Sequence, residues 1–248
     1  VKIQKILKFG ENMENKKNFL FLEFVRFVKE LRPQWFVLEN VGGITNINEG
    51  KTQTMIEDCF KAIKGYECIS SSILCASDFG VPQNRNRFFM VGNRLGIKFK
   101  YPSKHEKKIT VDEAINDLPS LQNGDMIDEA VYTLSLDEAS DYERLMRKDS
   151  DAPKQNYVSR NNDLVIERYK YIGQGQNWRA IPEYLMQNYA DKGRCHSGIY
   201  KRLRADKPSV VISNYRKSML IHPWEDRGIS VREAARLQSF PDTFTFEG

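Results

Sequence analysis

The chain has 248 residues, of which 40% are hydrophobic and 29% are charged, a balance typical of a globular protein with a packed core. No stretch approaches about 18 uninterrupted apolar residues, which excludes a membrane-spanning helix. The net charge of +5 permits a polyanionic partner without requiring one.

The cysteines and histidines argue against a disulfide framework and against a metal centre. Four cysteines are scattered without a Cys-x-x-Cys pair, and the three histidines are dispersed. A reducing cytoplasm is therefore the expected compartment. The first residues, from Val1 to Lys8, are basic and alternating and lack the apolar stretch of a secretory signal. The sequence also does not begin with methionine, so we expect a processed, trimmed or partial chain.

The first part of the chain alternates between helical and strand patterns. Residues 19–31 carry a broad apolar face and stop at Arg32-Pro33, as a helix does before proline. We expect a strand over 35–38, a Gly-Gly loop, a helix near 52–64 that stops at Gly65, a strand over 67–76, a loop over 77–86 and a strand over 87–92. This alternation predicts a layered α/β sheet.

After about residue 118 the chain becomes polar and irregular. A turn-rich connector over 117–125 leads into residues 126–228, where tyrosine, arginine and asparagine interleave and apolar runs are short. The best strand pattern in this region covers 208–213.

Residues 230–238 predict a short, well-capped helix. Ser230 is a good N-cap, and Glu233 follows at the capping-box spacing. Arg232 and Arg236 are four residues apart and so share one face of this helix. That face is either an exposed basic surface or the side of a helix pinned between two domains or against a nucleic-acid backbone.

Glu39 directly follows the apolar run 35–38 and precedes Asn40 and, after Val41, two glycines. In an open α/β sheet, ligands bind at the carboxyl ends of the strands. An apolar strand would desolvate such a carboxylate and suit it to acid or base chemistry. The alternative is that Glu39 only caps the next segment or pairs with a nearby arginine.

A second polar segment, Gln83-Asn-Arg-Asn-Arg87, lies where a loop enters a strand. If both arginines belonged to the strand, Arg85 and Arg87 would point to the same face. Two guanidiniums buried there would need an acidic side chain, a phosphate or a polar ligand edge as a partner. The alternative is an ordinary surface ion pair.

Three separated motifs, in this order along the chain, resemble signature blocks of the cytosine-5 DNA methyltransferases, most closely those of the bacterial restriction-modification or phage type. They are Glu39-Asn40-Val41, the Gln83–Arg87 segment and the run from Arg232 to Pro241 (Arg-Glu-Ala-Ala-Arg-Leu-Gln-Ser-Phe-Pro). The segments 79–82, 110–119, 175–182 and 200–227 resemble the family as well. The likeness covers nearly the whole chain from about residue 19.

The resemblance implies an α/β fold, with part of a Rossmann-like S-adenosylmethionine-dependent methyltransferase sheet and a smaller, irregular target-recognition domain. Residues 1–125 would form the rear part of the catalytic domain, 126–228 the DNA-binding domain, and 229–248 a helix block at the domain junction. The polar content of 126–228 suits contacts with phosphates and base edges of double-stranded DNA. The expected location is the bacterial cytoplasm, in association with the nucleoid and without a membrane partner.

The chemistry of the family implies a role for each candidate residue. These enzymes flip a cytosine out of the duplex, add a cysteine thiolate to C6 and pass the methyl group of S-adenosylmethionine to C5. By resemblance, Glu39 hydrogen-bonds the N3 side of the base, and Asn40 shapes the active-site loop. Arg87 is directed at the cytosine O2, with Arg85 beside it as support. Leu20 falls where the family places a residue against the adenosyl group of the cofactor.

The chain also departs from the family pattern. No Pro-Cys pair occurs, and all four cysteines (Cys59, Cys68, Cys75 and Cys195) follow Glu39, whereas the family nucleophile precedes the glutamate. The glycine-rich cofactor loop and the closing block of the family are also missing. Three explanations stand side by side: a partial chain of a full enzyme, one subunit whose partner carries the cysteine, or an inactive relative that still binds DNA. An RNA cytosine-5 methyltransferase of the same fold is a further alternative.

Overall fold

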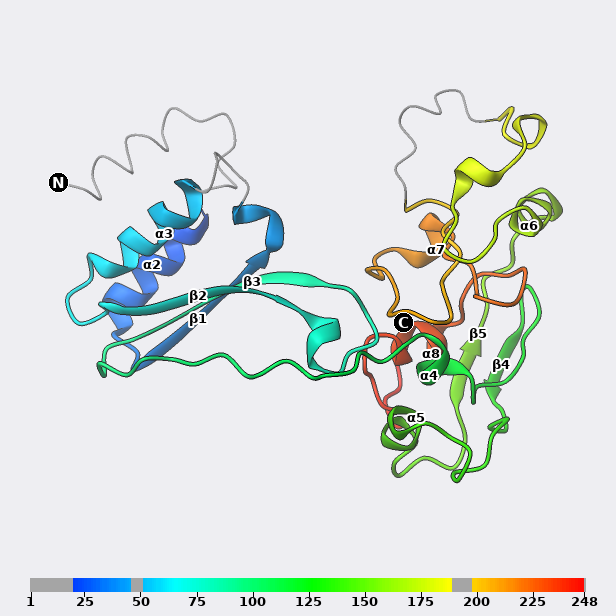
Figure 1. The fold of residues 1–248 in the computed structure, drawn as a ribbon, viewed down its shortest axis with the longest axis horizontal. Coiled ribbons are helices and arrows are strands. Elements are labelled where there is room, and N and C mark those ends of the chain that lie inside the picture. The colour runs from blue at the N-terminus through cyan, green and yellow to red at the C-terminus, as the bar shows by residue number, and fades with distance from the viewer. Residues whose placement is uncertain (1–19, 46–50, 189–197, 248) are drawn as a thin grey trace. The chain divides into compact units, whose positions relative to one another are not determined.

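The structure is a computed structural model, and it describes residues 20–45, 51–188 and 198–247. The chain divides into two compact units, whose elements are labelled in Figure 1. Unit 1 comprises Val1–Cys75 and Asn86–Lys104, and unit 2 comprises Ala76–Arg85 and His105–Gly248. Each unit is therefore built from two separate stretches of sequence.

Unit 1 is a three-stranded antiparallel sheet with two helices on one face (Figure 1). The strands are β1 (Trp35–Val41), β2 (Cys68–Cys75) and β3 (Asn86–Asn93), and their order β1-β3-β2 puts β3 in the centre. The helices are α2 (Leu20–Leu31) and α3 (Lys51–Lys61). The helices and strands that the sequence predicts in this part of the chain are thus confirmed.

Apolar side chains at helical and strand spacing build the core of unit 1. Helix α2 buries Phe21, Val25 and Val28, which are three or four residues apart and so share one helix face. Strand β1 buries Phe36 and Leu38, which alternate with exposed neighbours. The helices and the sheet meet along this single apolar layer.

Gly92 in β3 allows an aromatic ring to lie directly against the sheet. It is opposite Phe36 across the β1–β3 pair, and a Cβ atom at this position would be 2.3 Å from the Phe36 ring. That ring also stacks on Phe60 of α3, with centroids 4.4 Å apart. A larger residue at position 92 would displace Phe36 from this stack.

The opposite face of the sheet is only partly covered. The segment after β3 crosses it, and the Tyr101 hydroxyl lies 2.9 Å from the carbonyl oxygen of Ser70 and 3.0 Å from that of Phe89. Along β1, by contrast, Val37 and Val41 are 57% and 56% exposed. Strand β1 therefore presents one of its faces to solvent.

Unit 2 consists of short elements joined by irregular segments. Its helices are α4 (Asp112–Ile115), α5 (Asp141–Met146), α6 (Asp163–Lys170), α7 (Tyr215–Ser218) and α8 (Val231–Arg236), and its strands β4 (Met126–Glu129) and β5 (Lys154–Tyr157) pair antiparallel. One apolar cluster gathers side chains of α4, α5 and α8, and another surrounds α6. The helix predicted over 230–238 is confirmed as α8, and the Ser230–Glu233 capping box is present.

The strand predicted over 208–213 does not form. Only Ser209 pairs, through an isolated parallel bridge to Gln83, and the Asn84 N–H donates to the Ser209 carbonyl oxygen at 2.8 Å. A strand needs a neighbour for each successive peptide group, and within the described residues no ladder continues beyond Ser209. The apolar side chain of Ile212 is buried in the cluster around α8 instead.

A buried ion-pair network fixes α8 inside unit 2. The Nε and Nη2 atoms of Arg236 donate to the two carboxylate oxygens of Asp242, each at 2.6 Å. Its Nη1 lies 3.1 Å from Oδ1 of Asp117, and all three side chains are fully buried. Burial alone would lower the pKa of Arg236, but the hydrogen bonds and charges of the two aspartates outweigh it and raise the pKa. Arg236 therefore stays charged.

Arg232, one turn earlier in α8, is also fully buried. Its guanidinium donates to the backbone oxygens of Lys154 and Phe244, both at 2.8 Å, and of Pro241 at 3.1 Å. The predictions of an exposed basic face and of a nucleic-acid backbone contact are both wrong. The helix is pinned within unit 2, because the partners of Arg232 and Arg236 are elsewhere in the same unit.

Arg227 and Glu233 form a second buried pair. The Nη1 and Nη2 atoms of Arg227 lie 2.9 Å and 2.7 Å from the two carboxylate oxygens of Glu233. His222 faces the same carboxylate, with its Nε2 atom 3.6 Å away. Burial alone would raise the pKa of Glu233, but the neighbouring Arg227 and His222 and the hydrogen bonds outweigh it and lower the pKa to about 2.

Replacing Arg236 by methionine should destabilise unit 2 strongly. The change leaves Asp117 and Asp242 buried without their cation, and breaking a buried pair in this way typically costs about 3–5 kcal/mol. Urea unfolding followed by circular dichroism measures the loss. Arg204→Met is the matched control, because Arg204 pairs with Asp206 on the surface, and its unfolding midpoint should equal that of the wild type. Equal midpoints for the two variants would contradict this reading of the network.

The pKa of Glu233 predicts how stability falls in acid. In the folded chain this pKa is lowered from 4.5 to about 2, so the unfolded chain binds the proton first as the pH falls. The stabilisation by the carboxylate is complete above about pH 5 and is lost as the pH falls through the folded-state pKa. The difference in unfolding free energy between wild type and Glu233→Gln should therefore shrink over this range. Urea titrations at successive pH values test it, and a difference independent of pH would refute it.

Candidate active site

Glu39 and Arg87 form an ion pair across β1 and β3 in unit 1. The Nε atom of Arg87 lies 2.9 Å from Oε1 of Glu39. In the antiparallel register Glu39 is opposite Phe89 and Arg87 is opposite Val41, so the two charged residues are diagonal neighbours on one face. The antiparallel pairing thus brings together two motifs that are far apart in the sequence.

The position of Glu39 corrects two expectations. Strand β1 extends beyond residue 38 because Glu39, Asn40 and Val41 all pair with β3, so Glu39 belongs to the strand rather than to a loop. The Glu39 side chain is 50% exposed and that of Arg87 is 21% exposed. The apolar strand therefore does not desolvate this carboxylate. The pair itself is what the alternative interpretation, a carboxylate bound to a nearby arginine, predicts.

Asn40 lies between Glu39 and the end of β1. Its Oδ1 atom accepts a hydrogen bond from the Val41 backbone N–H at 2.8 Å. Contacts of this kind between a side chain and the local backbone favour turns, and the short 3-10 helix Gly42–Thr45 follows directly. Asn40 thus shapes the backbone just after the candidate carboxylate, and its role in catalysis stays a prediction.

The segment from Gln83 to Arg87 divides between the two units. Buried Gln83 donates from Nε2 to the carbonyl oxygen of Leu237 at 3.3 Å, within unit 2. Arg85 ends this stretch of unit 2, whereas Arg87 lies in β3 of unit 1. Arg85 precedes the strand, so the two arginines do not share a strand face. The role of Arg85 in supporting Arg87 therefore stays a prediction.

Leu20 is the first residue of α2 and is 67% exposed. The buried face of this helix is formed by Phe21, Val25 and Val28. An exposed leucine at this point is available for an apolar contact with a bound molecule. Its assignment to the cofactor stays a prediction.

Cys59, the buried cysteine of α3, is unsuited to act as a nucleophile. Burial, together with the charge of Asp58, raises its pKa to about 11 and keeps the thiol protonated. Cys68 and Cys75 are the two end residues of β2 and are partly buried. Cys195 lies outside the described residues.

The described part of the chain holds neither a candidate metal site nor a candidate membrane-spanning helix. There, no three His, Cys, Asp or Glu side chains are grouped so that they could hold a metal ion. None of the helices described is long and apolar enough to cross a membrane.

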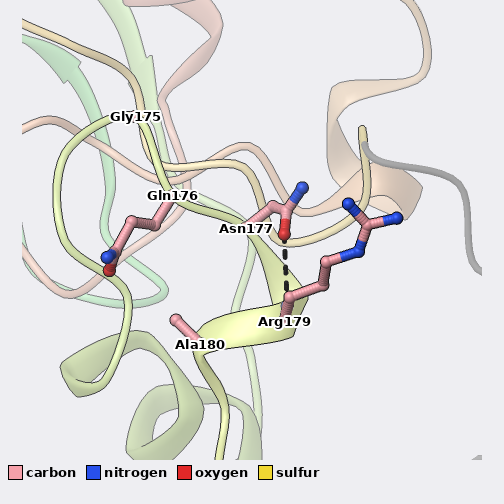
Figure 2. Close-up of a pocket in the computed structure, with 5 residues that line it drawn as sticks. All are labelled: Gly175, Gln176, Asn177, Arg179 and Ala180. Atoms are coloured by element: carbon pink, nitrogen blue, oxygen red, sulfur yellow. Dashed lines mark hydrogen bonds between the residues drawn. The ribbon is translucent and has the colours of Figure 1, made fainter.

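A hollow of about 290 Å³ in unit 2 lies over the loop from Gly175 to Ala180 (Figure 2). Asn177 caps the short 3-10 helix Trp178–Ala180, because its Oδ1 accepts the Arg179 backbone N–H at 3.1 Å. Figure 2 shows the Gln176 and Arg179 side chains pointing away from each other. The loop belongs to the segment 175–182, which resembles the family but for which the sequence predicted no role.

A second hollow in unit 2, of about 500 Å³, is lined by Arg160 and Arg216 among others. No motif in the sequence marks these two arginines. They stand in polar stretches, as does Arg168, which the fold uses internally to bind the carbonyl oxygen of Leu185. Only the three-dimensional contacts separate arginines that the fold uses from those that it leaves exposed.

Comparison with known proteins identifies relatives of the whole chain. Residues 8–248 match the family described as C-5 cytosine-specific DNA methylase. The chain is 33% identical to the Type II methyltransferase M1.HphI of Haemophilus parahaemolyticus, over 95% of this chain and 55% of that protein. It is 31% identical to the Type II methyltransferase M.DdeI of Desulfomicrobium norvegicum, over 96% and 60% respectively. The chain thus spans little more than half the length of these relatives.

Among solved structures, the fold is similar to that of a DNA modification methyltransferase encoded within a prophage (Escherichia coli). The TM-score is 0.67 at 23% identity, over 94% of this chain and 66% of the other. This likeness concerns the fold, and it confirms the predicted class, an α/β chain with part of a Rossmann-like methyltransferase sheet.

Glu39→Gln should leave the stability of unit 1 nearly unchanged. The carboxylate is half exposed, and ion pairs at such positions typically contribute less than about 1 kcal/mol. Urea unfolding of wild type and variant measures the difference. Glu57→Ala is a useful comparison, because Glu57 is less exposed and accepts a hydrogen bond from Ser71 at 2.7 Å, so its loss should be larger. A larger loss for Glu39→Gln would mean that Glu39 is mainly structural.

Proposed function

Because the chain belongs to the family of C-5 cytosine-specific DNA methylases, we propose that its whole protein methylates C5 of a flipped cytosine in a specific sequence of double-stranded DNA. The observation that carries this proposal is the Glu39–Arg87 pair, in which two family-like motifs meet at 2.9 Å on an open sheet face. Similarity to Type II methyltransferases supports a place in bacterial restriction-modification.

A carboxyl group beside a guanidinium complements the polar edge of cytosine. Protonated Glu39 would donate to N3 and accept from the N4 amino group, while Arg87 would donate to O2. Donation to N3 draws electron density from the ring and prepares C6 for addition of a thiolate. C5 then holds the electron pair that takes up the methyl group, and loss of the C5 proton and of the thiolate restores the ring. S-adenosylmethionine, when bound, would supply the methyl group, and its sulfur would leave as the thioether S-adenosylhomocysteine.

Three other residues would support this chemistry. Asn40 would hold the backbone that follows Glu39, as its hydrogen bond to the Val41 N–H supports. Arg85 would add positive charge beside Arg87. Leu20, whose side chain is 67% exposed, would pack against the adenosyl part of the cofactor.

A non-catalytic DNA-binding subunit is the second candidate function. Cys59 would not serve as its nucleophile, because burial raises the pKa of this thiol to about 11 and keeps it protonated. A partner would then carry the nucleophile and the cofactor loop. Residues 126–228 would bind the duplex in either case.

Glu39→Gln should keep DNA binding and lower methyl transfer by about 100-fold or more, because it removes the acid and leaves the docking surface intact. Tritium transfer from S-adenosylmethionine to duplexes of varied sequence, with the full-length protein, measures the rate. Glu57→Gln is the matched control in the same unit, and it should keep the wild-type rate. Equal rates for Glu39→Gln and the wild type would remove Glu39 from the mechanism.

The same assay separates the candidate functions. Transfer to cytosine C5 of duplex DNA supports the methyltransferase. Duplex binding with a steep salt dependence but no transfer supports the DNA-binding subunit. If the protein methylates tRNA and added duplex DNA does not reduce this transfer, an RNA methyltransferase would replace both candidate functions.

A further inference from the structure

Arg160 and Arg216 stand apart from the arginines that hold unit 2 together. Buried Arg202 and Arg236 donate to groups within the unit, and surface Arg204 binds the carboxylate of Asp206 through two nitrogens. Arg160 and Arg216 are both exposed. Among the described residues, neither guanidinium has a hydrogen-bond or ion-pair partner, although that of Arg216 lies over the Tyr215 ring, 6.0 Å from its centroid.

These two arginines line the same hollow, of about 500 Å³. Met126 and Tyr157, from the β4–β5 pair, line it as well. Met126 is 70% exposed, so its side chain is accessible to a molecule that enters the hollow. The hollow therefore combines apolar walls with two guanidiniums that no carboxylate of the described residues neutralises.

The loop that carries Arg160 is firmly held. Asn123 donates from Nδ2 to the Asn161 carbonyl oxygen at 2.8 Å, and the Asn161 N–H donates to Oδ1 of Asn123 at 2.9 Å. Gly124, with a φ of +86°, lies under the arginine: a Cβ atom there would be 2.7 Å from Arg160 Nε. Glycine is thus required for Arg160 to lie across this turn.

The carboxylates near the hollow are already engaged. Asp125 accepts the Gln122 N–H at 2.7 Å, and Asp128 accepts the Tyr157 hydroxyl at 2.8 Å. They are therefore occupied by local contacts and neither pairs with the two guanidiniums. The positive charge of the hollow remains available to a ligand from outside.

We propose that Arg160 and Arg216 form a DNA-reading pocket of unit 2. The ligand chemistry is a pair of neighbouring acceptor atoms on duplex DNA, either O6 and N7 of a guanine or two oxygens of a phosphate, which a guanidinium binds through two hydrogen bonds. The apolar walls of Met126 and Tyr157 suit the flank of a base or sugar. The proposal rests on the proposed function, because it takes duplex DNA as the ligand.

The test compares duplex binding by the full-length protein and its variants, using fluorescence anisotropy between about 50 and 200 mM salt. Arg160→Ala and Arg216→Ala should each weaken binding about 10- to 100-fold, as expected for loss of a bidentate contact. Arg204→Ala is the matched control, since it also removes one positive charge from unit 2. It should bind nearly as tightly as the wild type.

The form of the loss distinguishes the two sources of acceptor atoms. Weakening on every sequence, with a salt slope reduced by about 1, indicates a phosphate. Weakening confined to sites with guanine at one position indicates a base edge. Binding by both variants equal to that of Arg204→Ala would overturn the proposal.

Gly124→Ala tests the positioning of Arg160 without removing a charge. The added methyl group should displace the guanidinium and weaken binding as Arg160→Ala does. Gly96→Ala controls for backbone strain, because Gly96 also has a positive φ, +73°, but has no neighbouring atom within 4 Å of its added Cβ. Wild-type affinity in Gly124→Ala would contradict the proposed arrangement.

The experiments can refute the proposed pocket without refuting the proposed function. A wild-type protein that neither binds nor methylates duplex DNA would refute the proposed function and, with it, the pocket. A wild-type protein that methylates DNA, with Arg160→Ala and Arg216→Ala matching Arg204→Ala in affinity and site preference, would refute the pocket alone.

Discussion

The contact of Arg236 with Asp242 and Asp117 is the interaction on which unit 2 depends. Its described α-helices are short, from four residues in α4 to eight in α6, and helices of this length are marginal by themselves. Asp242 also accepts the Tyr132 hydroxyl at 2.7 Å, so the same carboxylate holds a distant segment in place. Buried charges of this kind restrict the chain to arrangements that satisfy all of them, since an unpaired buried charge is costly.

In unit 1 the equivalent constraint is the register of β1 against β3. One residue of slippage would turn Glu39 to the helix-covered face and separate it from Arg87. Gly92 and Phe36 hold this register, because the ring fits only where the opposite residue has no side chain. A packing detail in the core thus determines whether Glu39 and Arg87, on the other face of the sheet, lie close enough to pair.

Short sequence patterns correctly predicted those features of the fold that depend only on neighbouring residues. The apolar spacing of α2 and the capping box of α8 were correct because each depends on residues within one or two turns. The boundary of β1 and the exposure of Glu39 depend on pairing with β3, which no local pattern shows. The burial of Arg232 and Arg236 depends on partners such as Lys154 and Asp117. The predicted strand over 208–213 failed for the same reason, because its partner ends at Gln83.

The central place of β3 has a consequence for the order in which the chain is made. Strands β1 and β2 both pair with β3 and not with each other, yet β3 is the last of the three to leave the ribosome. Until then neither earlier strand has the β3 partner with which it pairs in the described sheet, and strands without a partner favour aggregation. The stretch Ala76–Arg85, which belongs to unit 2, is made in this interval. The sheet of unit 1 can therefore form only after a segment of unit 2 has been synthesised between β2 and β3.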